Sequence, residues 1–542
     1  MVYFAILSFF VSIYYYSRVI NEPLHPDSGE FIYPGIMQQL GFKKEYLQHN
    51  VDGKYKPTSL SYNVFPPEPH SNISNKKQYI GAFPYFRDKM FVWWFFEKFY
   101  YLFPLKTKSF RLINIFLIFL ISQLFFIIIH DFLGLYYSIF WSMIFQLTVM
   151  LPHFDFYQIH AEEWGTLLLI VLSILLTKLH YLFISPILFG LILIAIFFYI
   201  KITFAPTLLY FFLSPIVIFQ NLEFFRISTI SILVGLITLF LFYLFSGLLK
   251  PVFWSLNPFH LIKYKKSAGT SRTDDQRSTD FSIKKFIMSY FIEILIGLLA
   301  LAVTIQWLFY NSEPMKIEIF LFGWICVICI EVFVQGKLYP SHLLPLTIPG
   351  ILFIGLQNNL FSLIISILVF ILWSKFFFLS GESILSKYGK QSQNPYIDLM
   401  AQYDEVAKSI RQNTTKKDTI LSIGYSSPLY TLSKRKAALG LYEALTTIDP
   451  FDLQKKLGDN WEWWLLQAII VERPKLLVDS NSHVDSQELC NSLGISMKVI
   501  NSIDTYAIYK IDYKNMEKHP TNLGENIFTY KTGDRKCLFY IS

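Results

Sequence analysis

The sequence has little charge and few cysteines, and each shortage excludes a class of protein. Only 16% of its 542 residues are charged, whereas soluble proteins carry about a quarter. The composition therefore argues against an ordinary water-soluble enzyme. Four cysteines in a chain of 542 residues do not form a disulfide framework of the kind that stabilises small secreted domains.

Several nucleotide and hydrolase motifs are also missing. The sequence contains no Walker A motif, no glycine-rich dinucleotide fingerprint and no G-x-S-x-G motif. Nucleotide-driven transport and standard serine hydrolysis therefore lack their usual support. The net charge of +8 is modest and is not arranged in a pattern typical of nucleic-acid binding, so no nucleic-acid partner is expected.

Apolar residues, in contrast, are abundant. Hydrophobic residues make up 53% of the chain, with 54 Phe and 34 Tyr, which excludes a disordered protein. Runs long enough to cross about 30 Å of hydrocarbon predict a multi-pass α-helical membrane protein. The eleven expected spans lie near 2–19, 109–130, 132–151, 163–178, 181–200, 202–220, 227–248, 286–309, 317–335, 340–356 and 360–380.

The spans predict two domains and one shared compartment. The first span lacks a basic leader and a small-residue cleavage site, so we expect a retained anchor. If the N-terminus is cytoplasmic, the first loop (20–108), the basic loop (249–285) and the loop 152–162 all lie on the far side. We therefore expect a transmembrane domain over 1–380 and a soluble extracytoplasmic domain over 381–542.

Helix and strand patterns alternate in the second domain. A helical stretch from Tyr396 to Gln412 precedes apolar, strand-like runs at 419–424, 475–479, 497–500 and 506–511. This order predicts a small α/β domain with helices covering a sheet.

The first loop begins with paired acidic residues. In His25-Pro26-Asp27-Ser28-Gly29-Glu30, Pro26 suits the first position of a helix. Asp27 and Glu30 would then share one face and raise each other's pKa, and so could supply a base or a metal ligand. The alternative is a solvated capping turn.

Cationic residues adjoin the membrane at two places. Arg87 and Lys89 precede an aromatic stretch, 90–96, that is typical of an interfacial helix, and would lie at phosphate depth. Lys263 and Lys265 lie in the basic loop. Each lysine or arginine near a membrane surface contributes about 1 kcal/mol to the binding of anionic groups. Snorkelling anchors and plain headgroup contacts explain the same residues.

Another acidic pair opens a later span. An acid at the entrance of a span usually faces a polar cavity, and adjacent helical residues point about 100° apart. Only one of Glu162 and Glu163 should therefore line such a cavity, and the alternative is a cap at the membrane edge. His342 opens a span on the same side, where a lone histidine is more often structural than catalytic.

The cysteines give weaker signals. Cys326 and Cys329 have C-x-x-C spacing but lie in the middle of an expected span, so we interpret them as packing residues. Cys490 and Cys537 lie in the second domain and could form one disulfide in an oxidising compartment.

Taken together, these segments resemble the bacterial multi-pass glycosyltransferases of the GT-C fold, which include protein O-mannosyltransferases and the aminoarabinose transferases of lipid A. The resemblance covers nearly the whole chain. It rests on His25–Glu30, Tyr85, Arg87-Asp88-Lys89, Arg111, Glu162-Glu163, Tyr339-Pro340-Ser341-His342 with Pro345, Asp418–Gly424 and Ser427–Arg435. Many relatives have Lys-Pro-Pro where this chain has Lys89-Met90-Phe91, and its first loop is lengthened by the stretch from about residue 43 to residue 80.

The resemblance implies an inverting transfer of a sugar from a polyprenyl-phosphate donor to a lipid, glycan or protein acceptor. It implies a bacterial plasma (inner) membrane enzyme with its second domain outside the cytoplasm. Lipid phosphate is a competent leaving group, so cations must stabilise its developing charge. Arg87, Lys89, Lys263 and Lys265 are the candidates, with Arg111 and His342 as supporting residues.

An acceptor hydroxyl needs a base, and Asp27 is the first candidate because it directly follows a span. Glu30 or Glu163 would orient the acceptor or tune that base, with Glu162 supporting them. Some members of the superfamily use a divalent metal and others do not, and these carboxylates leave that question open. The alternatives are a flippase or transporter of a lipid-linked saccharide, and a polymerase or ligase of surface polysaccharide.

Overall fold

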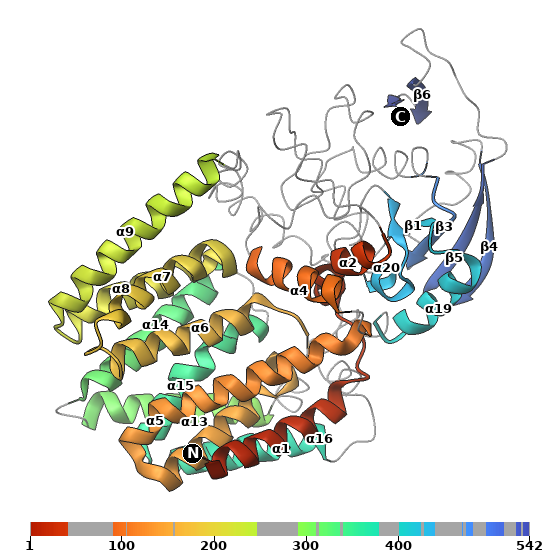
Figure 1. Ribbon diagram of the computed structural model, residues 1–542. Helices are drawn as coiled ribbons and strands as arrows, with labels where there is room; N and C mark the ends of the chain where they lie inside the picture. The colour runs from red at the N-terminus through yellow and green to blue at the C-terminus, as the bar shows by residue number, and fades with distance from the viewer. Residues whose placement is uncertain are drawn as a thin grey trace.

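The computed structural model describes residues 2–41, 90–103, 106–154, 158–245, 291–310, 314–335, 340–378, 400–423, 428–438, 469, 473–480, 495–513, 527–532 and 535–540. For some of these, Pro26 and Asp27 among them, the backbone alone is described. Helices pack into a bundle at the left of Figure 1, and a sheet lies at the right. Two further helices, α2 (Pro26–Gln39) and α4 (Met90–Leu102), lie between these two parts (Figure 1).

Helices occur in all eleven regions where spans are expected. Among the described residues, four helical stretches are long and apolar enough to cross a membrane: Val2–Val19, Thr107–Val149, Leu222–Phe245 and Leu360–Phe377. They support the prediction of a membrane protein, while the number of crossings stays a prediction. The bundle helices are α1 (Val2–Val19), α5 (Phe110–Val149), α6 (Ala161–Thr177), α7 (Ile184–Ala195), α8 (Ala205–Val217), α9 (Leu222–Phe245), α13 (Phe291–Tyr310), α14 (Lys316–Gln335), α15 (Thr347–Gln357) and α16 (Leu360–Phe377).

Helix α5 covers two of the expected spans and folds back on itself. Gly134, with φ of 70° and ψ of −179°, interrupts its helical geometry, in a region that side chains disfavour. The rings of Phe125 and Phe145 stack with centroids 4.2 Å apart. A straight helix would separate residues 20 positions apart by about 30 Å. The chain therefore reverses at Gly134, and α5 consists of two antiparallel helices.

A glycine allows α7 and α9 to pack closely. A Cβ added at Gly190 of α7 would lie 2.7 Å from the carbonyl oxygen of Ser228 and 3.0 Å from the Cβ of Ser231, both in α9. The backbones approach this closely because Gly190 has no side chain, as is common in membrane helix pairs.

Gly190→Ala is therefore expected to lower the free energy of unfolding of the purified protein in detergent by about 1–3 kcal/mol, the usual effect of overpacking. Its melting temperature should fall accordingly. The matched control is Gly297→Ala, since a Cβ at Gly297 in α13 meets nothing within 4 Å. Alanine favours a helix over glycine, so the control should melt at the same temperature or above. Equal melting temperatures for Gly190→Ala and the wild type would contradict the packing argument.

The C-terminal part contains the predicted sheet. It comprises α19 (Tyr403–Asn413), β1 (Thr419–Ile423), α20 (Pro428–Ser433), β2 (Lys436–Ala437), β3 (Leu476–Ser480), β4 (Ser496–Ile503) and β5 (Tyr506–Asp512). The strand order is β2-β1-β3-β5-β4, with β1 parallel to β2 and β3, and β5 antiparallel to β3 and β4. The four predicted strands are confirmed as β1, β3, β4 and β5.

The position of each strand in the sheet agrees with the burial of its side chains. β3 is buried throughout and β1 nearly so, as expected of strands covered on both faces. β4, at the edge, is largely exposed. A separate hairpin joins β6 (Ile527–Thr532) to β7 (Arg535–Tyr540), and the sequence analysis did not predict it. The predicted start of α19 at Tyr396 lies outside the described residues.

The cysteines of α14 differ in exposure. Cys326 is half-buried, whereas Cys329 lies exposed on the outer surface of the helix. The half-buried Cys326 is consistent with the predicted packing role, whereas the exposure of Cys329 does not fit it. The side chains of Cys490 and Cys537 lie outside the described residues, and the predicted disulfide is not tested.

Candidate functional site

Gln158 joins the start of the first loop to the segment that leads into α6. Its Oε1 accepts hydrogen bonds from the backbone N–H of His25 and from the Ser28 hydroxyl, both at 3.1 Å. Its Nε2 donates to the carbonyl oxygen of Pro23 at 3.0 Å. The Ser28 oxygen in turn accepts from the N–H of Ile159 at 2.8 Å. Two segments about 130 residues apart in sequence are thus fixed against each other.

This junction places the first turn of α2 beside the first turn of α6. The rings of His25 and His160 lie 5.8 Å apart, measured between centroids. Helix α2 begins at Pro26, as predicted, and α6 begins at Ala161. The two acidic segments identified in the sequence therefore meet at one end of the helix bundle. The Asp27 side chain lies outside the described residues, although its backbone belongs to α2.

Glu30 lies one turn further along α2 and is only 4% exposed. A carboxylate in a solvated capping turn would be accessible to water, so that alternative does not fit Glu30. Burying a carboxylate costs free energy, so proteins keep a buried carboxylate where it is paired or functional. Glu30 is therefore part of the interior of this junction.

Glu162 forms the centre of a buried cluster of charged groups. Its Oε1 is ion-paired with the Lys201 ammonium and lies 3.3 Å from the His342 Nε2. The three side chains are only 5%, 9% and 14% exposed, in the order Glu162, Lys201 and His342. Three distant parts of the chain supply them: α6, the break between α7 and α8, and the 3-10 helix η7 (Pro340–Leu346).

A second carboxylate adjoins this cluster. The Thr207 hydroxyl of α8 donates to the Glu331 Oε2 of α14 at 2.7 Å. Glu331 also interacts electrostatically with Lys201 and Glu162. Buried charges act strongly on one another because little water screens them. The cluster therefore holds a cation, two carboxylates and a histidine within the bundle.

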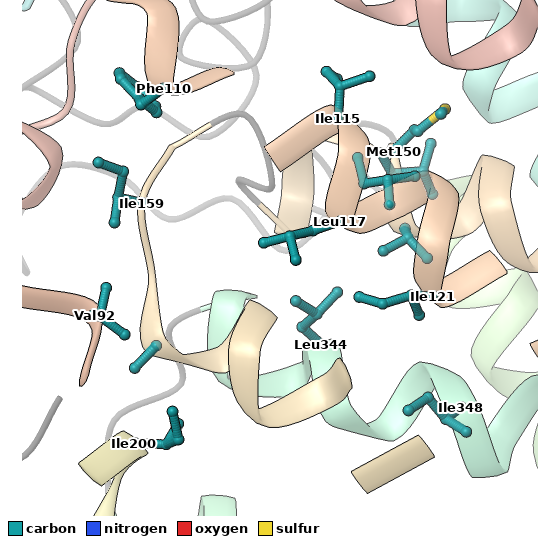
Figure 2. Packing of buried hydrophobic residues seen from close by; sticks show 14 of the residues in the cluster. Val92, Phe110, Ile115, Leu117, Ile121, Met150, Ile159, Ile200, Leu344 and Ile348 are labelled. Atoms are coloured by element: carbon teal, nitrogen blue, oxygen red, sulfur yellow. The ribbon is translucent and has the colours of Figure 1, made fainter. Parts of the chain in front are cut away.

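Buried apolar side chains neighbour the residues of this cluster along the chain. Figure 2 shows Ile159, just before α6, among buried apolar residues that include Val92, Leu117, Ile200 and Leu344. These come from α4, α5, the π-helix η4 (Ile196–Ile200) and η7. Ile200 directly precedes Lys201, and Leu344 lies in the same 3-10 helix as His342, so the charged cluster adjoins this apolar core.

The neighbouring Glu163 has a different environment. Its Oε2 accepts from the N–H of His160 at 3.5 Å as part of a capping box at the start of α6. Glu162 and Glu163 thus point in different directions, as the helical offset of about 100° requires. Glu162 faces the charged cluster, and Glu163 makes the capping contact that the alternative interpretation described.

The sequence analysis missed Lys201 and Glu331. Lys201 has an extended backbone (φ −163°, ψ 120°) at the end of η4, and single π-turns of this kind are frequent at functional sites. It is the only Lys, Arg, Asp or Glu between Lys178 and Glu223. Such a residue in a long apolar run is a candidate functional group by itself. That signal could have identified Lys201.

The aromatic helix predicted near 90–96 is α4, and it covers the start of α6. The ring of Trp164 lies 5.1 Å from that of Phe91 and 4.9 Å from that of Phe95. On another face of α4, Trp93 lies 4.6 Å from Phe31 of α2. α4 therefore packs against both helices of the junction in addition to exposing aromatic residues such as Trp94.

Arg111 stabilises the turn that leads into α2. Its guanidinium donates to the carbonyl oxygens of Ile20 and Pro23, each at 2.9 Å, and the residue is fully buried. Arg111 therefore supports the site through the backbone of the first loop.

Arg111→Met is expected to destabilise this turn by about 1–3 kcal/mol, because it removes the charged donor to two partly buried carbonyl oxygens. Limited proteolysis should cleave the variant faster between positions 20 and 41, and its melting temperature should fall. Arg226→Met, at an exposed position of α9, is the control and should match the wild type. Unchanged proteolysis in Arg111→Met would rule out the stabilising role.

The remaining predicted site residues are not placed. Arg87, Lys89, Lys263 and Lys265 lie outside the described residues. Within the part of the chain that the structure describes, no group of three or more His, Cys, Asp or Glu side chains is arranged to hold a metal ion. No model of a known protein family matches the chain, and no curated protein matches it by sequence.

Proposed function

We propose that the protein is a membrane glycosyltransferase of the GT-C type. It transfers a sugar, with inversion, from a polyprenyl-phosphate donor to a lipid, glycan or protein acceptor at the membrane surface. The observation that carries this proposal is the convergence of two acidic segments, 25–30 and 158–163, beside the buried Lys201. Transfer from a lipid phosphate needs carboxylates and a cation at one place.

The cationic part of the reaction falls to Lys201 together with the basic residues of the loops. A phosphate leaving group gains charge in the transition state, and a fixed ammonium in a dry environment stabilises that charge strongly. The Glu162 carboxylate holds Lys201 through their ion pair, and the His342 Nε2 lies 3.3 Å from the same carboxylate oxygen. Arg87, Lys89, Lys263 and Lys265 would complete the phosphate site from the two loops.

The acidic part falls to α2 and α6. Asp27, in the first turn of α2, would take the proton of the acceptor hydroxyl. Glu30 is buried one turn away and would tune that base, and Glu163 would orient the acceptor at the start of α6. The close contact between the two first turns supports this division of roles, since it requires Asp27 and Glu163 to lie on one side of the membrane.

The proposed location is a bacterial plasma membrane, with the C-terminal domain on the extracytoplasmic side. Lys108, before α5, forms an ion pair at 2.7 Å with Asp404 of α19. This contact supports a common side for the first loop and the C-terminal domain. Polyprenyl-linked donors and their acceptors would meet on that side.

Analysis of a deletion strain tests the function. Loss of one glycan residue from the cell surface, together with accumulation of one polyprenyl-linked sugar, would identify acceptor and donor at once. Restoring the intact gene should reverse both changes. Unchanged profiles of surface glycans and lipid-linked sugars would contradict a transferase.

A further inference from the structure

Helix α2 lies between the membrane bundle and the C-terminal domain. Every residue from Ser28 to Met37 is buried, although the helix belongs to a loop between two bundle helices. A helix with its whole circumference buried has packing partners on all sides. Figure 1 shows α4 on one side of α2 and α20 on the other.

Two hydrogen bonds attach α2 to the C-terminal domain. The Thr431 hydroxyl of α20 donates to the carbonyl oxygen of Gly29 at 2.7 Å. The Tyr33 hydroxyl, one turn along α2, accepts from the N–H of Ala437 in β2 at 2.8 Å. Both contacts connect residues about 400 positions apart.

The backbones of α2 and α20 also touch. A Cβ added at Gly29 would lie 2.8 Å from the Cα of Pro428 and 3.1 Å from its nitrogen. Real side chains do not approach a backbone that closely, so only glycine fits at this position. The two helices are therefore in direct backbone contact where the Thr431 hydroxyl binds.

The opposite neighbour of this turn is the membrane domain. Ser28, adjacent to Gly29, makes the hydrogen bonds to Gln158 and Ile159 described above. Gly35, two turns on, packs against α4, since a Cβ there would lie 2.5 Å from the carbonyl oxygen of Glu97. One turn of α2 is thus held from the membrane side by Ser28 and from the C-terminal side by Gly29.

The rest of the C-terminal domain holds α20 firmly. The Arg411 guanidinium of α19 donates to the carbonyl oxygen of Leu432 at 2.7 Å. The Tyr430 hydroxyl accepts from the N–H of Ser422 in β1 at 2.7 Å. Burial raises the pKa of Tyr430, so this phenol stays protonated. The position of α20, and of α2 against it, is therefore set by the domain's helix and sheet.

We propose that the C-terminal domain positions α2. The domain holds the first turn of that helix, which includes Asp27, against the start of α6. The catalytic consequence rests on the proposed function, whereas the positioning itself does not. Thr431 and Tyr33 act through the backbone and the helix, and are positioning residues. A domain that only captured the acceptor would need no contact with α2.

Hydrogen exchange of α2 tests this directly. In Thr431→Val the Gly29 carbonyl loses its side-chain donor, and a buried hydrogen bond contributes about 1–1.5 kcal/mol. We expect the amides of residues 28–37 to exchange about tenfold faster in the full-length protein in detergent. Thr431→Ser keeps the hydroxyl and should restore the exchange of the wild type. Tyr33→Phe removes the second contact and should act in the same direction.

The control is Ser409→Ala. Ser409 of α19 accepts a hydrogen bond from the Asn501 amide at 3.0 Å, inside the domain and away from α2. Its loss should leave exchange in residues 28–37 unchanged.

With a polyprenyl-phosphate sugar donor, Thr431→Val should lower kcat about tenfold and leave the KM for the donor near that of the wild type.

The outcomes separate the two proposals. Exchange of α2 that is the same in Thr431→Val, Tyr33→Phe and the wild type would overturn the positioning role, whatever the transfer activity. Faster exchange in both variants, in a protein that transfers no sugar from any lipid donor, would support the positioning role and contradict the proposed function. A rise in the KM for the acceptor alone, with unchanged exchange, would indicate an acceptor-binding domain and overturn the positioning role.

Discussion

Lys201→Met is expected to lower sugar transfer by about 10²–10³-fold, the usual effect of removing one group that stabilises developing negative charge. The methionine matches the length of the lysine stem but supplies no charge to the phosphate leaving group. The measurement is the rate of transfer from a polyprenyl-phosphate sugar by the purified variant. Binding of the donor should weaken as well, because the ammonium also attracts the phosphate in the ground state.

Loss of Lys201 alone leaves the Glu162 carboxylate without its ion-pair partner in a buried place, which destabilises proteins strongly. The double variant Lys201→Met with Glu162→Gln removes both charges, so we expect it to fold near wild-type stability and to stay inactive. Lys178→Met is the matched control, because Lys178 pairs with Asp131 at the opposite end of α6. Transfer at the wild-type rate by the stable double variant would remove Lys201 from the reaction.

Asp27→Asn is expected to lower the turnover by about 10²–10⁴-fold, the range attributed to a general base. The amide has nearly the same shape but cannot accept the proton of the acceptor hydroxyl. Binding of the lipid donor should remain near that of the wild type, since the base acts on the acceptor. Single-turnover transfer and donor binding, measured on the same preparation, separate these two effects.

Asp131→Asn makes the same chemical change in α5, where Asp131 pairs with Lys178 at the far end of α6, and should leave transfer intact. The comparison also distinguishes a transferase from a flippase. A flippase of lipid-linked saccharide has no hydroxyl to deprotonate, so Asp27→Asn would change its transport little. Full transfer activity in Asp27→Asn would require a different base, with Glu30 as the next candidate.

The sequence was sufficient to predict the helices of the bundle and four of the strands, but not β2 or the β6–β7 hairpin. Apolar length located the helices of the bundle, and apolar runs between turn residues located β1, β3, β4 and β5. Both signals are local, because a span or a buried strand is recognised from its own residues. The edge strand β2 has only two residues, too few for such a pattern, and it exists because β1 pairs with it.

The site was only partly predictable, because its residues are joined by tertiary contacts. The acidic segments near Asp27 and Glu163 were identified from their positions at span entrances. Their attachment through the Gln158 side chain could not be predicted, since a glutamine in a short loop has no distinctive pattern. Lys201 was not predicted as a site residue because it falls between two apolar runs, 181–200 and 202–220.

The burial of α2 also could not be predicted from the sequence. Its pattern of Pro26, Asp27 and Glu30 suits both a solvated turn and a buried helix. The close contacts at Gly29 and Gly35 decide between them, and each depends on a partner helix elsewhere in the chain. A glycine gives no indication of which backbone will approach it.

Cross-linking across the junction is the most direct test of the site. With the native cysteines replaced by serine, His25→Cys and His160→Cys should join through a disulfide or a short bifunctional thiol reagent in intact membranes, because their rings lie 5.8 Å apart in the native protein. His25→Cys paired with Tyr181→Cys should not join, since the 17 residues of α6 separate the two by about 25 Å. If the His25 and His160 pair does not cross-link, or if only the His25 and Tyr181 pair does, the two acidic segments do not meet, which would contradict a common site.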